Sequence, residues 1–134
     1  MKFSGSLDTN AILRLLINDI PSQHEAVKAL LVSANGQFAV ADIAIIELVF
    51  VLERYYGFSR QQASEALTGL MQLKEINCNR TLFEKALPIY LNHSALSFED
   101  CCLSNYAALN GAEPLWTFDK KLATQAPSAK LITT

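Results

Sequence analysis

Four acidic residues lie at positions from which their side chains could do chemistry. They are Asp8 in "SLDTN", Glu47 in the apolar run "DIAIIELVFVL", Asp100 in "SFED", and Asp119 directly after "PLWTF". Carboxylates gathered at one point repel one another, which raises their pKa values unless a cation lies between them. Oxygen ligands without accompanying His or Cys favour a hard ion, Mg²⁺ or Mn²⁺, over zinc. Such an ion polarises a phosphate, generates hydroxide from water and stabilises the leaving oxygen, which is the chemistry of phosphodiester hydrolysis.

Each of these acids also has a purely structural interpretation. Asp8 and Asp119 lie at predicted strand-to-helix junctions, where Asp is a favoured N-cap. Asp100 comes three residues after Ser97, which fits a capping arrangement and complements the helix dipole. Glu47 could form a buried salt bridge with Arg14 or Arg54. For each residue taken singly, both interpretations stay open.

The elements that must position these acids alternate between strands and helices. The predicted strands cover residues 3–8, 37–40, 75–79, 114–118 and 130–133. The predicted helices cover residues 8–19, 21–33, 41–56, 58–73, 81–93, 97–111 and 119–125. This alternation favours a mostly parallel central sheet covered by helices on both faces. No linker interrupts the pattern, so the sequence predicts one three-layer α/β/α domain over residues 1–134.

Several residues at helix ends support these boundaries. Pro21 suits the first turn of the helix over residues 21–33, and Gly36 is predicted as its left-handed cap. Gly57 closes the helix over residues 41–56. Ser59 and Gln62 have the spacing of a capping box.

The predicted topology brings the acids toward one edge of the sheet. In open parallel sheets, ligands bind beyond the carboxyl ends of the strands, where Asp8 and Asp119 are expected. Asp100, in the first turn of its helix, can face the same edge. Glu47 belongs to a helix that is apolar nearly all round and is therefore predicted to be buried. Jointly, the four positions favour a metal site over four unrelated structural roles.

Composition limits the function classes. The formal net charge is −2 and the isoelectric point is about 5.6, so bulk charge does not indicate nucleic-acid binding, although a local basic rim is compatible with these values. Three cysteines without a CxxC spacing argue against a disulfide framework and a zinc site. The start "MKFSGSLDTN" has no apolar signal core, and no apolar run is long enough to span a bilayer. The sequence therefore predicts a cytoplasmic protein.

An ordered set of motifs resembles a known family. These stretches are similar to successive motifs of PIN-domain ribonucleases, particularly VapC-like toxins of type II toxin–antitoxin pairs: "SLDTNAILRLL", "ADIAIIELVFVLERYYG", "SFEDCCLSNYAALNG" and "LWTFDKKLA". The similarity runs from about Leu7 to Ala123, in the expected order and spacing. A single motif such as "DTN" has little specificity, whereas the ordered set is specific.

The resemblance implies an Mg²⁺- or Mn²⁺-dependent endoribonuclease on the PIN fold. It assigns the catalytic and metal-ligand roles to Asp8, Glu47, Asp100 and Asp119. It places Asn10 and Thr117 where such domains carry polar residues that support the ligands. Similar toxins are inhibited by a small DNA-binding antitoxin whose C-terminal segment covers the site, and they commonly form homodimers.

The chain departs from the family pattern at two places near these acids. The first strand is more polar than usual, and Cys101 and Cys102 follow Asp100 where small residues are common. Glu99 adjoins Asp100 as a second acid, but the "F-x-D" spacing favours Asp100. None of these departures removes a ligand.

Basic residues around an acidic centre are candidates for contacts to RNA phosphates. The candidates are Arg14, Lys120 and Lys121, with Lys2 and Arg60 as further possibilities. Ordinary surface charge is the alternative for each of them. Lys120 and Lys121 are favoured because they adjoin Asp119.

Aromatic residues offer a second kind of RNA contact. Trp116, Phe98 and Tyr106 have rings on which bases could stack, but Trp116 lies within a strand and is predicted to belong to the core.

Two other function classes compete with the nuclease interpretation. The first is a non-catalytic PIN-like module that binds RNA or protein and uses the acids only as helix caps. The second is a phospho-acceptor signalling domain, which the sequence disfavours. "LDTN" has one Asp where an acidic pair is expected, and "EINCN" has none at the end of the third strand.

Overall fold

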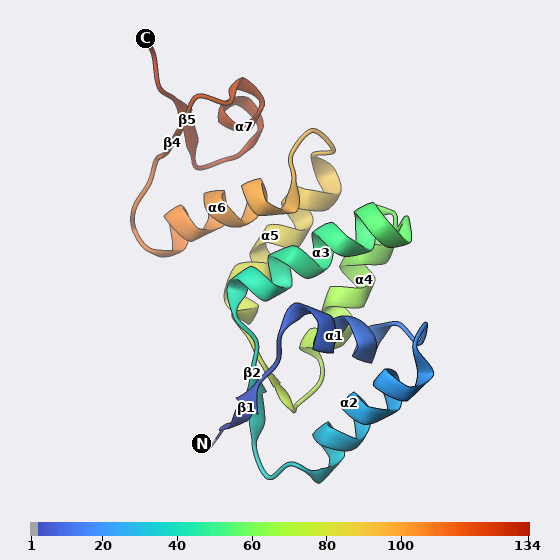
Figure 1. Cartoon of the computed structure of the whole chain (residues 1–134). Coiled ribbons are helices and arrows are strands. Elements are labelled where there is room, and N and C mark those ends of the chain that lie inside the picture. Colours follow the sequence, from blue (N-terminus) through green and yellow to red (C-terminus); the bar gives the residue numbers. More distant parts are fainter. Residues whose placement is uncertain (1–2) are drawn as a thin grey trace. The chain divides into compact units, whose positions relative to one another are not determined.

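The computed structural model describes residues 3–134. The described chain divides into two compact units, the first ending at Asn79 and the second running from Arg80 to Thr134 (Figure 1). Each unit is described by itself below. That residues 1–134 form one domain stays a prediction.

The first unit is built on three short parallel strands. Its elements are β1 (Phe3–Ser6), α1 (Thr9–Leu16), α2 (Pro21–Ser33), β2 (Gln37–Ala39), α3 (Asp42–Tyr56), α4 (Arg60–Met71) and β3 (Ile76–Asn77). The strand order is β1-β2-β3, with Gly5 paired to Phe38 and Phe38 paired to Ile76. Each pair of helices connects one strand to the next parallel strand, as a crossover connection requires.

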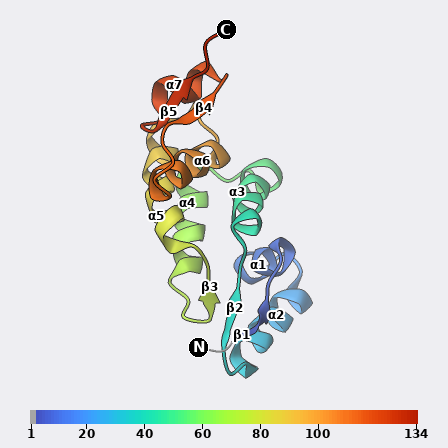
Figure 2. The same cartoon turned by 90° about the vertical axis from the view of Figure 1, so that its left-hand side faces the viewer.

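The helices of this unit are packed against one another. α1 contacts both α2 and α3, and α3 contacts α4. Figures 1 and 2 show α1 between α2 and α3. Apolar residues from α1, α3 and β2 are buried here, among them Ile12, Ile45, Leu48 and Phe38. This packing fixes the residues that follow the carboxyl ends of β1 and β2.

Capping explains most helix boundaries. The Ser59 side chain accepts a hydrogen bond from the Gln62 backbone N–H, and the Gln62 side chain accepts one from the Ser59 backbone N–H, which confirms the capping box. Gly57 ends α3 in the left-handed conformation, with φ of 66°. The prediction for Gly36 is wrong, because the left-handed glycines in residues 3–134 are Gly57 and Gly111, with Gly5 at φ 146°. The chain leaves α2 in extended conformation already at Ala34.

The second unit consists of two packed helices and a small sheet. Its elements are α5 (Arg80–Asn92), α6 (Phe98–Leu109), β4 (Leu115–Thr117), α7 (Lys120–Gln125) and β5 (Ala129–Leu131). Phe98 anchors α6 against α5, because its ring stacks on Phe83 at 5.9 Å and forms a T-shaped pair with Tyr90 at 5.3 Å between centroids. β4 and β5 pair in parallel, and α7 connects them.

The predicted α/β class with parallel strands and flanking helices is confirmed. Every strand pair within residues 3–134 is parallel, with the strands in two sheets, β1-β2-β3 and β4-β5. No helix in the same range is both long enough and apolar enough to cross a membrane.

Candidate functional site

Asp8 follows β1 and caps α1. One carboxylate oxygen, Oδ1, accepts a hydrogen bond from the Ala11 backbone N–H at 2.8 Å, and the side chain is exposed. A carboxylate has about four acceptor positions, so one capping bond leaves most of them for another partner. The capping interpretation of Asp8 is therefore confirmed, and it is compatible with a ligand role.

The carboxyl ends of the three strands in the first unit carry further polar residues. Asp42 begins α3 shortly after β2 and accepts a hydrogen bond at 3.3 Å from the amide of Asn79, which follows β3. The Thr9 hydroxyl donates to the Ala44 carbonyl at 3.4 Å and so joins the start of α1 to the start of α3. Asp8 and Asp42 therefore lie at one edge of this sheet. The sequence analysis did not select Asp42 as a candidate, although Asp42 follows the strand "QFAV" much as Asp8 follows the first strand.

Glu47 is exposed on α3, so the prediction that it is buried is wrong. Ile43 and Phe50, one turn before it and one turn after it, are 76% and 57% exposed. The buried face of α3 consists of other residues, namely Ala44, Ile45, Leu48, Val49 and Leu52. An apolar sequence on all sides of a helix did not lead to packing on all sides. The desolvation cost that buried glutamate would carry does not arise.

The alternative interpretation of Glu47, a buried salt bridge with Arg14 or Arg54, is also wrong. Within residues 3–134, Glu47 forms no ion pair, and Arg14 instead pairs with Asp19 at 2.8 Å. The Arg14 guanidinium also donates to the Tyr56 hydroxyl at 3.0 Å and to Gln23 at 3.0 Å. The carboxylate of Glu47 is thus left open to solvent or to a ligand.

Arg14 is held by a network that joins α1, α2 and α3. The Tyr56 hydroxyl donates to Asp19 at 2.6 Å while it accepts from Arg14. The hydrogen bond with Tyr56 and the charge of Asp19 raise the pKa of Arg14, and the hydrogen bond from Tyr56 and the charge of Arg14 lower the pKa of Asp19. With its guanidinium committed to these partners, Arg14 has a structural role that competes with the predicted contact to RNA.

Asp100 lies in the first turn of α6. Its backbone N–H donates to the Ser97 hydroxyl at 3.1 Å, so the cap uses the main chain of Asp100 and leaves its carboxylate free of that task. Asp100 is half-buried whereas Glu99 is exposed. Both observations favour Asp100 over Glu99 as the ligand on this helix. Cys101 and Cys102 behind it are buried.

Asp119 follows β4 and caps α7. Its Oδ1 accepts hydrogen bonds from the backbone N–H groups of Lys121 at 2.9 Å and Leu122 at 3.2 Å. Its own N–H donates to the Thr117 hydroxyl at 3.0 Å, so Thr117 fixes the turn that presents Asp119. This hydrogen bond is consistent with the supporting role predicted for Thr117, which stays a prediction. Lys120 and Lys121 are exposed beside Asp119.

The remaining predicted residues lie as follows. Asn10 is exposed in the first turn of α1 and lines a small pocket between α1 and α2 together with Arg14 and Gln23. Arg60 is half-buried at the start of α4, and Lys2 lies outside the described residues. Asn10 makes no hydrogen bond to Asp8 within the described part of the chain, so its supporting role stays a prediction.

The aromatic residues differ from expectation. Phe98 is buried in its stack with Phe83 and Tyr90, so it is not available to a base. Trp116, predicted in the core, is 57% exposed, and Tyr106 is exposed to the same fraction.

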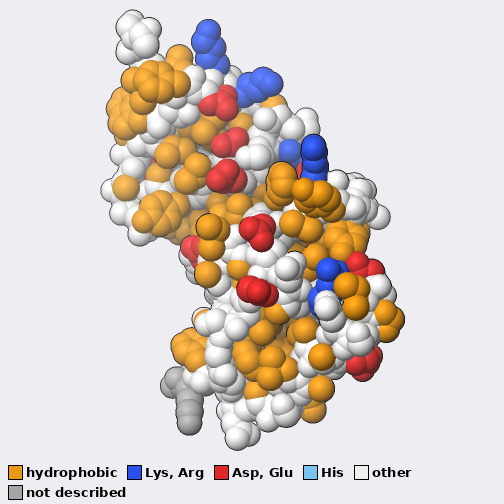
Figure 3. Space-filling view, in the orientation of Figure 1, with side chains coloured by type: hydrophobic (Ala, Val, Ile, Leu, Met, Phe, Trp, Pro, Cys, Tyr) orange, Lys and Arg blue, Asp and Glu red, His pale blue; other side chains and the backbone are white. Residues whose placement is uncertain are grey.

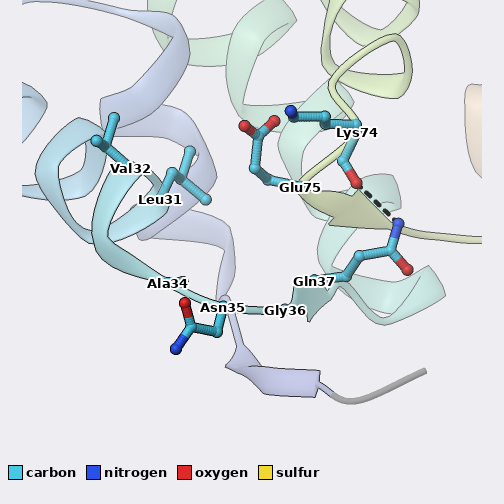
Figure 4. A pocket seen from close by; sticks show the side chains of 8 residues that line it. All are labelled: Leu31, Val32, Ala34, Asn35, Gly36, Gln37, Lys74 and Glu75. Carbon is cyan, nitrogen blue, oxygen red and sulfur yellow. Dashed lines mark hydrogen bonds between the residues drawn. The ribbon is translucent and has the colours of Figure 1, made fainter.

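A second pocket lies at the opposite end of the strands. It is lined by Leu31, Val32, Ala34, Asn35, Gly36, Gln37, Lys74 and Glu75. Figure 4 shows the Gln37 side chain donating to the Lys74 carbonyl, at 2.8 Å, beside this pocket. Because Gln37 begins β2, this pocket is at the amino end of the strand and not at the edge that carries Asp8 and Asp42.

The four predicted ligands are thus distributed over both units. Asp8 and Glu47 belong to the first unit, and Asp100 and Asp119 belong to the second. Across residues 3–134, no three acidic, His or Cys side chains form a cluster that could hold a metal ion. All four side chains end in oxygen donors, the set that hard divalent cations prefer. The chemistry of the donors fits such an ion, and their convergence stays a prediction.

Comparison with known proteins gives four findings. A family model described as the PIN domain matches residues 6–126. Among solved structures, the VapC20 toxin of Mycobacterium tuberculosis, described as cleaving the sarcin–ricin loop, is 17% identical, with a TM-score of 0.43 over 90% of this chain and 94% of that one. A toxin–antitoxin complex from Klebsiella pneumoniae is 21% identical, with a TM-score of 0.34 over 97% of each chain. No curated protein matches the sequence.

Proposed function

The chain belongs to the PIN-domain family, and from that premise we propose that it is a metal-dependent endoribonuclease that hydrolyses RNA phosphodiester bonds. The observation that carries the proposal is the placement of its acids. Asp8 and Asp119 each follow a parallel strand, and Asp100 begins a helix with its carboxylate unused by the cap. These are the positions from which carboxylates reach a ligand beyond the carboxyl ends of strands.

The positions of these acids at helix N-termini reduce the electrostatic cost of bringing their carboxylates together. Asp8, Asp100 and Asp119 each lie at or within the first turn of a helix, where the helix dipole carries partial positive charge. That charge offsets part of the repulsion among the carboxylates.

In the proposed mechanism, Asp8, Asp100 and Asp119 would hold the metal, and Glu47 would be a further ligand or would orient a water molecule. When bound, Mg²⁺ or Mn²⁺ supplies charge that polarises the phosphate and acidifies water. Thr117 holds the turn before Asp119, and Ser97 holds the turn before Asp100, so both carboxylates are presented by fixed backbone. Lys120 and Lys121, which are exposed beside Asp119, would attract RNA phosphates.

The decisive experiment uses RNA cleavage by the full-length chain. We expect cutting of a structured RNA in Mg²⁺ or Mn²⁺, and loss of cutting in EDTA. Asp100→Asn should lower the rate by more than the roughly 10–100-fold that removal of an outer-shell partner produces. Glu99→Gln is the matched control, because it removes the adjacent exposed acid and should leave the rate nearly unchanged. Cleavage that persists both in EDTA and in Asp100→Asn would exclude the proposal.

We further propose that the chain acts as the toxin of a toxin–antitoxin pair, with a small DNA-binding antitoxin as partner and a homodimer as its assembled state. The motif set that resembles VapC-like toxins supports this role. Co-expression with the product of a short reading frame that overlaps the upstream end of the gene tests the pairing. The partner should co-purify with the chain and abolish cleavage. Light scattering of the purified protein reports the dimer, and a monomer at micromolar concentration would contradict it.

A non-catalytic PIN-like module is the second candidate. The hydrogen bonds that Asp8 and Asp119 make to helix N–H groups favour it, because these acids already have a structural use. Calorimetric titration with Mn²⁺ separates the two candidates. A purely structural set of caps should show no saturable binding, whereas the nuclease should bind the ion and lose affinity on Asp100→Asn.

A further inference from the structure

The small sheet of the second unit has one covered face and one exposed face. β4 and β5 pair Leu115 with Ala129, Trp116 with Lys130, and Thr117 with Leu131. Because side chains alternate along strands, Trp116 and Lys130 share one face, and the other two pairs share the opposite face. α7 contacts both strands, and its Leu122 is buried, as is Ala129 of β5. α7 therefore covers the Ala129 part of one face, on which Leu131 stays 36% exposed, and Trp116 on the other face is exposed.

Large aromatic side chains occupy this open region. Trp116 is 57% exposed, and Phe118, two residues further along the chain, is 67% exposed. Two large aromatic side chains this exposed and this close in the chain leave apolar area in water and form a candidate binding surface. Figure 3 shows hydrophobic side chains beside lysine or arginine side chains at the C-terminal end of the chain.

The charge around these rings is positive. Residues 115–134 contain three lysines, Lys120, Lys121 and Lys130, and one acid, Asp119, in a chain of net charge −2. Within residues 3–134, none of these lysines forms an ion pair. Exposed aromatic rings interleaved with unpaired lysines suit a partner that has both flat apolar rings and negative charge. Single-stranded nucleic acid has both, because its bases stack on aromatic side chains and its phosphates attract lysines.

The position of the rings relative to Asp119 agrees with such a partner. Phe118 immediately precedes Asp119, and Trp116 precedes it by three residues, about 10 Å of extended chain. A base stacked on either ring would place its flanking phosphates near the Asp119 carboxylate. We propose that Trp116, Phe118 and Lys130 form a stacking platform that binds the single-stranded part of the RNA substrate next to Asp119.

The proposal rests on the proposed nuclease function, but its test is independent of cleavage. Trp116 is the single tryptophan of the chain, so its fluorescence reports this site alone. The experiment uses full-length Asp100→Asn, which should not cut the probe, and an unstructured single-stranded RNA of about 12 nucleotides. We expect saturable quenching by the single strand, weaker quenching by its duplex, and protection of Trp116 from iodide when the single strand is bound.

Three substitutions identify the contacts. Trp116→Ala and Phe118→Ala should each weaken binding of the same RNA, labelled with fluorescein, by about tenfold, the loss typical of one base–aromatic stack. Lys130→Ala should reduce the slope of log affinity against log salt by about 0.7, the value for one phosphate contact on a single strand. Tyr55→Ala is the matched control, because Tyr55 is an exposed aromatic residue on α3 outside this sheet, and it should leave affinity unchanged. Thermal melts of all variants verify that each one folds.

Each contrary outcome has a definite meaning. Emission typical of a buried indole that iodide does not quench would show that the folded chain itself covers Trp116, which would overturn the platform. An exposed Trp116 that responds only to a protein partner would overturn it in favour of a protein interface. If the wild-type chain cuts RNA but Trp116→Ala has an unchanged KM, the platform fails and the nuclease stands. If RNA binding depends on Trp116 but no metal-dependent cleavage is found, the nuclease fails and the platform stands.

Discussion

At the scale of single residues, the carboxylates of the chain divide into those that the fold uses and those that it leaves open. Asp8 and Asp119 cap helices with side-chain oxygens, and Asp19 is bound by Arg14 and Tyr56. Asp100 leaves its cap to Ser97, and Glu47 is exposed without an ion pair in the described chain. Asp100 and Glu47 make the fewest structural contacts through their carboxylates. Their substitution should therefore lower activity with little effect on stability.

Glu47→Gln tests this distinction. We expect weaker Mn²⁺ binding and slower RNA cleavage, while the free energy of unfolding changes by less than about 0.5 kcal/mol, as is usual for exposed positions. Urea denaturation and calorimetry with Mn²⁺ measure the two effects separately. Glu53→Gln, on the same helix, is the control for a change of charge on α3. Normal cleavage by Glu47→Gln would remove Glu47 from the metal centre.

Tyr56 should stabilise the first unit through its hydroxyl group. Tyr56→Phe removes the hydrogen bond to Asp19 and should lower the free energy of unfolding by about 0.5–1.5 kcal/mol. Tyr55→Phe is the control, because Tyr55 is exposed, and its effect should be close to zero. Urea denaturation at neutral pH compares the two variants.

The same network predicts a dependence on pH. Tyr56 and Arg14 lower the pKa of Asp19 in the folded chain. The Asp19 carboxylate therefore makes its full contribution to folding stability at pH values above its ordinary pKa of 3.8. It is lost as the pH falls through the lower value of the folded state. The difference in stability between wild type and Tyr56→Phe should therefore be constant near pH 7 and shrink below about pH 4. A difference that grows with acidity would contradict this assignment.

At the scale of elements, two glycines offer a matched test of helix geometry. Gly57 ends α3 at φ 66°, whereas Gly69 lies inside α4, and an added Cβ would meet no atom within 4 Å at either position. Gly57→Ala should therefore destabilise the chain by about 1–2 kcal/mol through backbone conformation alone. Gly69→Ala should stabilise it by about 0.5–1 kcal/mol through helix propensity. Thermal or urea denaturation should give these opposite signs.

The cap of α6 links stability to the candidate site. Ser97→Ala removes the acceptor of the Asp100 N–H and should cost about 1 kcal/mol of stability. It should also slow RNA cleavage, because the first turn that presents Asp100 is loosened. Ser97→Thr retains a hydroxyl group and should restore both properties. A stable Ser97→Ala variant with lowered activity would contradict the proposed coupling.

The elements themselves were largely predictable from the sequence, and the reason is local. Capping residues act on backbone groups within one turn of themselves, so they can be recognised from the local sequence. The helices begin or end where Ser59 with Gln62, Gly57 and Pro21 indicate. Errors arose where the outcome depends on distant contacts. The apolar sequence around Glu47 does not reveal which face of α3 is covered, and a tryptophan in a strand does not reveal which face of the sheet is open.

At the scale of the whole molecule, membership of the PIN-domain family agrees with the ordered motifs that the sequence presents. The candidate site was predictable as a set of residue types, because Asp after a strand and Asp at a helix start are visible in the chain. Their convergence was inferred from the topology of the strands and stays a prediction, because Asp8 and Asp119 are more than 100 residues apart and loop closure over that distance leaves no local signature. Asp42 shows that the same signal also marks acids beyond the predicted four.

Metal binding gives a test at this scale. An ion that binds only the folded chain stabilises it by about 2.7 kcal/mol at 100 times its dissociation constant. Mn²⁺ should therefore raise the melting temperature of wild type, EDTA should reverse the shift, and Asp100→Asn should abolish most of it. Glu99→Gln should retain the shift. An equal shift in Asp100→Asn would place the ion elsewhere.

The capping bonds of Asp8 and Asp119 also determine what a genetic selection against activity would recover. Asn caps helices about as well as Asp, whereas Ala does not, so Asn at either position should leave a folded, inactive chain and Ala should weaken the helix as well. At Asp100, whose cap belongs to Ser97, both substitutions should leave a folded chain. If an inhibitor protein is made alongside, the folded inactive alleles still sequester it, and an allele that is destabilised enough to unfold does not. Alleles with identical loss of cleavage would thus have opposite effects when a second, active copy is present in the same cell.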